Sequence, residues 1–374
     1  MPKDWRELQR GVTHHDLVDF LRWWGSQLRE ARLLAPHWPK EWGGGFSVAE
    51  QVVIAEELAR GDVPRNALYH VGVFNVAPAL LHSGTAAQRE RFLPGIWNGE
   101  VWCQGFSEPN AGSDLAGLQT RAVRDGDRYL VNGQKVWTSW AKEADWCMLL
   151  ARTDPEASKH KGISCLIVDM HSPGIDVRPI RQAWGPADFN EVFFDEVEVS
   201  VDRLLGTENN GWAVAQGTLA PERAVAILDM TERLRCNGIE AAVARAAGWS
   251  LENGEPALAD SAVREMFAQR YAEVHVLRHM LNDMIDGILQ GTDVSGTSSI
   301  IKVFYSELLH ELTKNVTDLQ GLEGQLDVPV LACAGWETAH WMNDYIHSFG
   351  WLIGGGTNEI QRNVIGERML GLPR

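Results

Sequence analysis

The sequence predicts an α+β multidomain protein, with helical domains at both ends and an antiparallel β domain between them. Apolar residues recur at helical spacing up to about residue 100 and again from about residue 207. Between them, turn signals come roughly every eight to twelve residues and separate β-rich runs, a pattern typical of antiparallel sheets. The 374 residues suffice for two or three packed units. We therefore predict an N-terminal helical domain at 1–100, a central β domain at 101–206 and a C-terminal helical bundle at 207–374.

The composition restricts the class of partner. Asp and Glu number 50 against 34 Lys and Arg, a formal net charge of −16, which argues against nucleic acid or an anionic membrane as partner. No run approaches the ~18 apolar residues that a membrane span needs. The five cysteines are scattered without a CxxC pair, so we expect neither a disulfide framework nor a metal site. The charged N-terminus lacks an apolar run, and we expect a cytoplasmic location.

The N-terminal region contains two clear helix signals. Leu17, Phe20, Leu21, Trp24 and Leu28 recur at helical spacing. After a glycine-rich loop, Ser47 with Glu50 forms the pattern of a capping box and predicts the start of a second helix.

Two further helices are expected before residue 100. The segment 66–81 is nearly uncharged, which suits a buried helix. Thr85 and Gln88 form another capping-box pattern, and Pro94 predicts the end of that helix.

The central domain opens with Trp102–Asp114, WCQGFSEPNAGSD, in which an apolar run gives way to a Ser-Glu-Pro turn and then small residues. Gly112 permits close backbone approach. Ser107, Ser113 and Asp114 offer polar groups beside free N–H groups, which suits a flat, phosphorylated ligand. A solvated connection between two elements is the alternative interpretation.

A second pattern lies downstream, where Asn132-Gly133 separates the β-rich runs 129–131 and 134–137. The Asn-Gly pair predicts a tight hairpin at this point. The glycine-rich strand–turn–helix of a Rossmann unit is missing, so a bound nucleotide would be held by another architecture.

The C-terminal region reads as long helices with short polar connections, which predicts a helical bundle. The expected helical segments are Ala213–Trp249, Ser261–Leu289, Ser298–Leu319 and Trp336–Phe349, interrupted at 251–256 and 321–329.

Three motifs together resemble one family. SEPNAGSD and NGQKVWTSW are similar to the flavin-binding signature of the acyl-CoA dehydrogenases, and GGTNEIQRNVIGERMLG resembles the last helix of that family. Their order and spacing extend the resemblance over essentially the whole chain. It implies a C-terminal four-helix bundle, FAD as cofactor and an oxidoreductase of fatty acid or lipid catabolism. The implied reaction converts an acyl-CoA thioester to a trans-2-enoyl-CoA, with electron-transfer flavoprotein as acceptor, in a homodimer or homotetramer.

The resemblance also assigns contacts with the flavin ring. Phe106 and Ser107 fall where the family's backbone and hydroxyl touch the ring, and Trp137 falls where an aromatic residue covers it. Ser139 stands where a threonine usually hydrogen-bonds N5.

Other contacts are assigned along the cofactor and the substrate. Ser113 matches a serine on the pyrophosphate or CoA side, and Thr357 and Glu359 match positions near the adenosine end.

The catalytic base departs from the family's commonest pattern. The usual Glu-Gly-Thr triplet is replaced by Gly355-Gly356-Thr357, and glycine cannot abstract a proton. The N–H of Gly355 can still donate to the thioester oxygen. Branches of the family with a relocated base carry a glutamate before an arginine in the first long helix of the bundle. Glu222-Arg223 stand there, so Glu222 is the predicted base and Arg223 a substrate contact; a dipole-favoured acid in a helix's first turn is the alternative.

A second departure concerns contacts across subunits. The family's Arg-x-x-Phe-Gly is reduced to Arg245-Ala-Ala-Gly248, and the glutamine–glycine turn survives only at 320–324. In one interpretation, the chain itself holds the flavin by a different set of contacts. The alternative is a hetero-oligomer in which a related chain completes the site and this chain is a half-site or non-catalytic subunit. Gly355 would enlarge the acyl pocket, which favours bulky, branched or polycyclic acyl groups.

Overall fold

The computed structural model describes residues 5, 14–183, 185, 187–217, 222–292, 294–325 and 340–373; the side chains of residues 222–226, 295 and 323 are not among those described. The chain forms two compact units, each assembled from separate stretches of sequence. Unit 1 comprises Met1–Val12, Val48–Pro64 and Pro221–Arg374, and unit 2 comprises Thr13–Ser47 and Arg65–Ala220. The domain borders at 100/101 and 206/207 stay a prediction.

The helices of unit 2 precede its sheet and follow it. They are α2 (His14–Glu30), the π-helical Gly72–Val76 with α4 (Ala77–Ser83), α5 (Ala86–Trp97) and α6 (Gly211–Gly217). Leu21 of α2 and Leu80 of α4 are almost fully buried. The prediction of helices before the sheet is therefore confirmed for the described residues.

Helix α5 confirms one prediction and corrects another. The capping box is present, since Thr85 Oγ1 accepts from the Gln88 N–H at 3.2 Å and Gln88 Oε1 accepts from the Thr85 N–H at 3.0 Å. The predicted end at Pro94 is wrong, because the helix runs on to Trp97. Proline removes a single helical hydrogen bond, and the buried side chain of Ile96 holds the last turn in the core.

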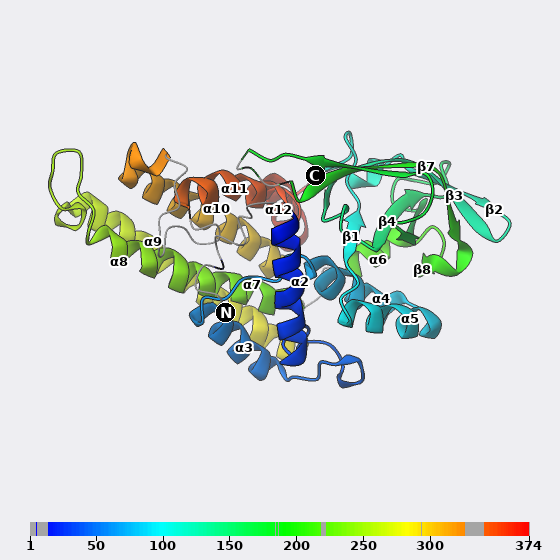
Figure 1. Ribbon diagram of the computed structural model, residues 1–374, viewed down its shortest axis with the longest axis horizontal. Coiled ribbons are helices and arrows are strands. Elements are labelled where there is room, and N and C mark those ends of the chain that lie inside the picture. Colours follow the sequence, from blue (N-terminus) through cyan, green and yellow to red (C-terminus); the bar gives the residue numbers. More distant parts are fainter. Residues whose placement is uncertain are drawn as a thin grey trace. The chain divides into compact units, whose positions relative to one another are not determined.

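The sheet of unit 2 is mainly antiparallel (Figure 1). Its strands are β1 (Trp102–Gly105), β2 (Arg121–Asp125), β3 (Arg128–Ser139), β4 (Trp146–Arg152), β5 (Ile163–Asp169), β6 (Ile175–Ile180), β7 (Phe189–Ser200) and β8 (Leu204–Leu205). Their order is β6-β7-β3-β2-β4-β5-β8, and β1 pairs in parallel with β4. Strands β4 and β5 are buried almost throughout, which places the core of the unit beneath them.

The hairpin predicted at Asn132-Gly133 is wrong, because β3 continues through both residues. The tight turn lies earlier, where Asp125 pairs with Arg128. Asn132 is instead bound to β7, donating to Glu196 Oε1 at 2.6 Å and accepting from the Glu196 N–H at 2.9 Å. A Cβ on Gly133 would lie 2.5 Å from Thr120 Oγ1, so glycine is needed here for close packing and not for a turn.

Unit 1 is a bundle of helices, which confirms the helical prediction for the C-terminal region. It also includes residues 48–60, from the segment predicted as the N-terminal helical domain, and it excludes residues 211–217. Its elements are α3 (Val48–Arg60), α7 (Glu222–Arg233), the π-helical Leu234–Glu240, α8 (Ala241–Ala246), α9 (Ser261–Leu289), α10 (Ser295–Gln320), α11 (Trp341–Ile353) and α12 (Asn358–Val364). Helix α7 packs against α3 and α9, and α10 packs against α9 and α11. Leu228, Leu277, Leu281 and Leu312 are fully buried in the shared core. Residues 336–339 of the helix predicted at 336–349 lie outside the described residues.

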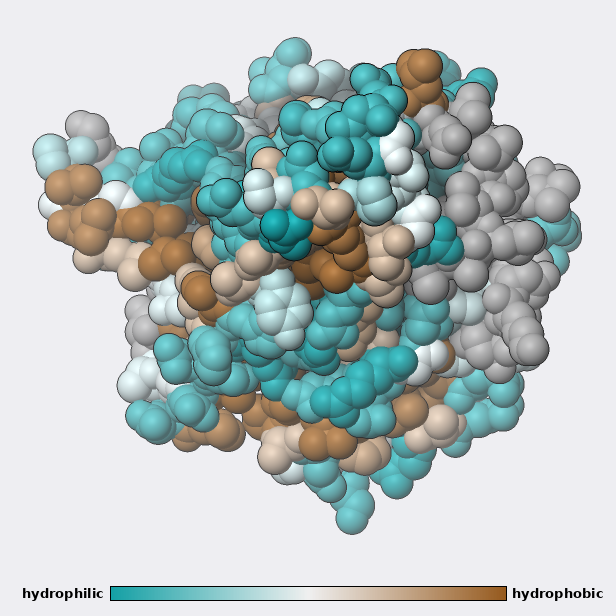
Figure 2. Space-filling view, turned by 90° about the vertical axis from the view of Figure 1, so that its left-hand side faces the viewer, coloured by the Kyte–Doolittle hydropathy of each residue, from teal (hydrophilic) through white to brown (hydrophobic). Residues whose placement is uncertain are grey.

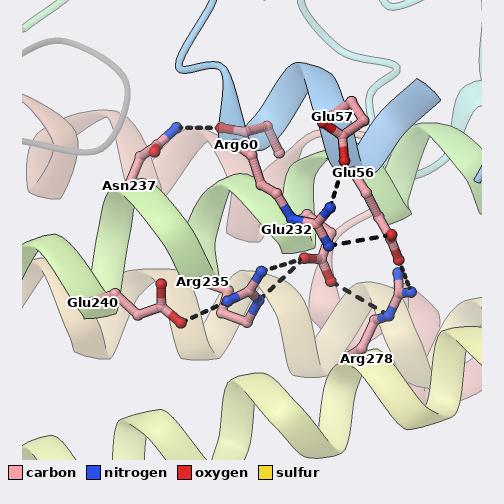
Figure 3. A network of polar contacts seen from close by, with 9 residues as sticks. Glu56, Glu57, Arg60, Glu232, Arg235, Asn237, Glu240 and Arg278 are labelled. Carbon is pink, nitrogen blue, oxygen red and sulfur yellow. Dashed lines mark hydrogen bonds and ion pairs between the residues drawn. The ribbon is translucent and has the colours of Figure 1, made fainter. Parts of the chain in front are cut away.

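A network of charged side chains joins α3, α7 and α9 (Figure 3). Glu232, only 3 % exposed, accepts from Arg235 Nη2 at 2.9 Å and faces Arg278 Nε at 3.3 Å. Arg278 also binds Glu56 of α3. Arg235 belongs to the π-helical segment that follows α7, so Glu232 links this irregular turn to a neighbouring helix. The network fixes the contacts of α7 with both of its neighbours.

Apolar side chains also reach the surface of unit 1, among them Val276 on α9 and Phe349 and Ile353 on α11. Figure 2 shows apolar residues, in brown, among hydrophilic ones on the face that it draws. None of the helices that the structure describes is long and apolar enough to cross a membrane.

Candidate functional site

In unit 2, the loop after β1 lies against β3. The C=O of Ser107 accepts from the Val136 N–H at 2.9 Å, and Lys135 Nζ donates to the C=O of Phe106 at 3.1 Å. Both loop residues are half-buried. Among the described residues nothing pairs with the N–H or the hydroxyl of Ser107. These two groups are therefore available donors beside β3, and the ligand predicted for this loop stays a prediction.

The strand next to this loop carries a β-bulge. Lys135 pairs with Val192 and Thr138 with Asn190, so an advance of three residues along β3 matches an advance of two residues along β7. Trp137, inside the bulge, has φ +59° and is 59 % exposed. Bulges re-aim side chains, and here a large aromatic face is turned outward. Such a surface suits stacking on a flat ring.

Ser139 lies two residues further along β3, paired with Phe189 of β7. Its hydroxyl has no hydrogen-bond partner within the part of the chain that the structure describes. Phe189 packs edge-on against the Trp137 indole at 6.2 Å between ring centroids. Trp137 and Ser139 therefore share one partner residue on the neighbouring strand.

Ser113 is exposed in the same loop as Ser107. A tight turn precedes it, closed by reciprocal bonds between the backbones of Glu108 and Ala111 at 3.1 and 3.0 Å. A Cβ built on Gly112 would touch no atom within 4 Å. The described residues therefore do not account for the close backbone approach predicted at Gly112.

Sequence reasoning missed the ion pair under this loop. Lys135 Nζ lies 2.7 Å from Glu108 Oε1, with side-chain exposures of 0 % and 8 %. The Glu108 carboxylate also accepts from the backbone N–H groups of Gln119 at 2.7 Å and Thr120 at 2.9 Å. Desolvation opposes its charge, yet Lys135 and these hydrogen bonds hold the pKa of Glu108 below its usual value. Burial in turn lowers the pKa of Lys135. A lysine directly before the apolar Val136-Trp137 of β3 is the signal that could have revealed the pair.

In unit 1, the glycine motif forms the turn between α11 and α12. Gly355 has φ +68° and Gly356 φ +90°, conformations that favour glycine. A Cβ on Gly355 would meet no atom within 4 Å. The Gly355 C=O accepts from Gln361 Nε2 at 3.0 Å, whereas its N–H has no partner in the described ranges.

The two adenosine-side candidates lie at the start of α12. Thr357 is the N-cap residue, and its side chain accepts from the Ile360 N–H at 3.3 Å. Glu359 is exposed; its own N–H and the Thr357 hydroxyl hold the pKa of its carboxyl below the usual range. Both side chains thus contribute to the first turn of this helix.

A second lysine, also missed, fixes both sides of the glycine turn. Lys302 Nζ on α10 donates to the Leu352 C=O at 3.2 Å and to Asn358 Oδ1 at 2.7 Å. Desolvation lowers the pKa of Lys302 to about 8. The buried Asn358 also accepts from Ser306 Oγ at 3.0 Å. The turn is thereby held in place relative to α10.

The predicted base is the first residue of α7, since that helix begins at Glu222. The side chains of Glu222 and Arg223 lie outside those described, so their predicted roles stay predictions. Arg245 lies in the last turn of α8. No cluster of metal-ligating side chains occurs among the residues searched, which are the described ones.

Three family models match successive parts of the chain, and curated relatives match most of its length. Family models described as the N-terminal, middle and C-terminal domains of acyl-CoA dehydrogenase match residues 7–100, 103–197 and 209–370. Acyl-CoA dehydrogenase IpdE1 of Mycobacterium tuberculosis is 37 % identical, over 96 % of this chain and 90 % of that protein.

Solved structures resemble the fold over its full length. The structure titled Tcur3481-Tcur3483 steroid ACAD matches with a TM-score of 0.85 and 30 % identity, covering 100 % of this chain and 94 % of that one. The ChsE4-ChsE5 complex from Mycobacterium tuberculosis matches with a TM-score of 0.81 and 30 % identity, covering 100 % and 93 %.

Proposed function

The chain belongs to the acyl-CoA dehydrogenase family, and from this premise we propose that it binds FAD and oxidises an acyl-CoA thioester to the trans-2-enoyl-CoA. The observation that carries the proposal is the bulge that turns Trp137 outward beside the Ser107 donors, which have no partner among the described residues. A flavin supplies the hydride acceptor that no side chain can provide.

The residues of unit 2 fit a flavin. The Ser107 N–H and hydroxyl can donate to polar atoms at the ring edge, and the exposed indole of Trp137 can cover the ring face. The Ser139 hydroxyl, which lacks a partner among the described residues, can donate to N5. Ser113 and Phe106 complete this part of the site. On unit 1 we assign Thr357 and Glu359 to the adenosine end.

The proton chemistry is assigned to Glu222. Its carboxylate would take the α-proton while Arg223 holds the substrate. Water exclusion by an apolar acyl group increases the basicity of such a carboxylate. Negative charge then builds on the thioester oxygen. The donor that we assign to it is the N–H of Gly355, for which the described part of the chain offers no acceptor.

The open glycine turn is the basis on which we propose a substrate class. Because no described atom lies within 4 Å of a Cβ position on Gly355, we propose a bulky or polycyclic acyl group. A matched structure is titled a steroid ACAD, which supports this choice. Electron-transfer flavoprotein is the proposed electron acceptor.

The test is a panel of acyl-CoA thioesters added to the purified, yellow protein under anaerobic conditions. We expect bulky and polycyclic acyl groups to bleach the flavin absorbance faster than straight chains. Equal bleaching by all acyl groups would contradict the substrate class, and absence of bleaching by any acyl-CoA would contradict the activity.

The missing Arg-x-x-Phe-Gly motif favours a second candidate, a half-site subunit that works beside a related chain. Matched structures are titled as pairs of chains, ChsE4-ChsE5 and Tcur3481-Tcur3483. About one FAD per subunit in the chain purified alone would support a homo-oligomer. A colourless chain that gains flavin only when copurified with a related chain would support the hetero-oligomer.

Moving the base tests whether positions 222 and 355 serve one α-carbon. In the variant Glu222→Gly/Gly355→Glu, we expect bleaching at least about tenfold faster than in Glu222→Gly alone. The new side chain has space, but its φ of +68° costs about 1–2 kcal/mol. Single-turnover bleaching rates measure the recovery, and Gly355→Ala in the Glu222→Gly background is the control. If a folded, flavin-loaded double variant shows no recovery, positions 222 and 355 do not serve the same α-carbon.

A further inference from the structure

We propose that the buried Lys135–Glu108 pair positions the flavin-binding loop 106–114, so that FAD affinity depends on the Lys135 ammonium beyond its contribution to stability. This inference rests on the proposed function. Lys135 is a positioning residue, because it acts through the loop and not on the reacting atoms.

The ammonium binds two consecutive parts of the loop. Lys135 Nζ donates to the Phe106 C=O at 3.1 Å and to Glu108 Oε1 at 2.7 Å. Its stem passes under Gly105 at the end of β1, where a Cβ would approach Lys135 Cγ to 3.4 Å and Leu149 Cδ1 to 2.9 Å. This packing places the Lys135 ammonium next to the backbone of the loop.

The direction of one peptide group connects this pair to the ligand. In a trans peptide the C=O of one residue points opposite to the N–H of the next. Holding the Phe106 C=O toward Lys135 therefore turns the Ser107 N–H away from Lys135. That N–H has no acceptor among the described residues, although the neighbouring Glu108 N–H has one.

Burial separates this pair from an ordinary surface contact in the same region. Lys159 and Asp114 lie 2.6 Å apart, but both side chains are more than 60 % exposed. Exposed ion pairs of this kind contribute little to the free energy of folding. Removal of one partner of a buried pair leaves an uncompensated charge inside the protein. The chain thus contains a matched control for the effect of burial.

The experiment compares four variants: Lys135→Met, Glu108→Gln, the double variant, and Lys159→Met as the control. The flavin-loaded protein, or its complex if a related chain is needed, is stripped of FAD and titrated with FAD. Urea unfolding gives stability, and hydrogen exchange of the amides in 106–114 gives the order of the loop in the apoprotein.

We expect Lys135→Met to raise the FAD dissociation constant at least about thirtyfold and to speed exchange in the loop about tenfold. The double variant should regain most of the lost stability, because no buried charge is unpaired, yet keep at least about a tenfold loss of affinity, because the Phe106 C=O still lacks its donor. Lys159→Met should stay within about twofold of the wild type.

Recovery of both stability and affinity in the double variant would overturn the proposal, as would unchanged affinity in Lys135→Met. A wild-type protein that binds no FAD, alone or in complex, would instead contradict the proposed function. In that case faster loop exchange in Lys135→Met still supports the positioning of the loop, and unchanged exchange overturns it.

Discussion

Replacement of Glu222 by glutamine is expected to leave FAD bound and to slow flavin bleaching by acyl-CoA by about 10²- to 10⁴-fold. Glutamine keeps the size and shape of the side chain but cannot accept the α-proton. No carboxylate stands at position 355 to replace it, since that residue is glycine. Anaerobic stopped-flow absorbance, with the best acyl-CoA of the panel, measures the rate.

The matched control is Glu240→Gln, the same change at another glutamate of unit 1, which is 40 % exposed and bound to Arg235. We expect it to bleach within about threefold of the wild type. Normal bleaching in Glu222→Gln would remove this residue from the mechanism. Acyl-CoA affinity, measured separately by titration, distinguishes a lost base from lost substrate binding.

Replacement of Glu232 by leucine is expected to lower the free energy of local opening of α7 and α9 by about 3 kcal/mol. This carboxylate is 3 % exposed and faces both Arg235 and Arg278. Its loss leaves two partly buried guanidinium groups, 19 % and 18 % exposed, with fewer acceptors. One nitrogen of Arg278, Nη1, already has none among the described atoms. Native-state hydrogen exchange of the two helices measures the change.

Glu57→Leu is the control, because it makes the same substitution at an exposed member of the network. Glu57 pairs with Arg60, and the two side chains are 64 % and 51 % exposed. We expect a change below about 0.5 kcal/mol. Equal effects of the two variants would mean that the buried carboxylate contributes no more than a surface one.

The parts of the fold that depend on local patterns are predictable from the sequence. Helical spacing and the Thr85–Gln88 capping box depend on residues within one or two turns, and the structure confirms both. The Asn132-Gly133 signal failed because a distant strand, β7, offers partners to both sides of the pair. Pro94 failed for a similar reason, since burial of Ile96 outweighs one missing hydrogen bond.

The candidate site shows the same division. The motifs locate Ser107, Trp137 and Ser139, because each lies within a short recognisable pattern. They give no sign of the β-bulge that exposes the Trp137 indole, nor of the contact between Lys135 and Glu108 across 27 positions. Both features depend on contacts between segments that are distant in the sequence: β3 with β7, and β3 with the loop after β1.

The assembly of unit 1 from distant stretches of sequence has a consequence for biosynthesis. Helix α3 emerges from the ribosome more than a hundred residues before α7, the helix on which it packs. Until then its apolar side, including Ala55, has no native partner within the unit. Nascent chains halted before the bundle is translated would expose this helix to chaperones and proteases.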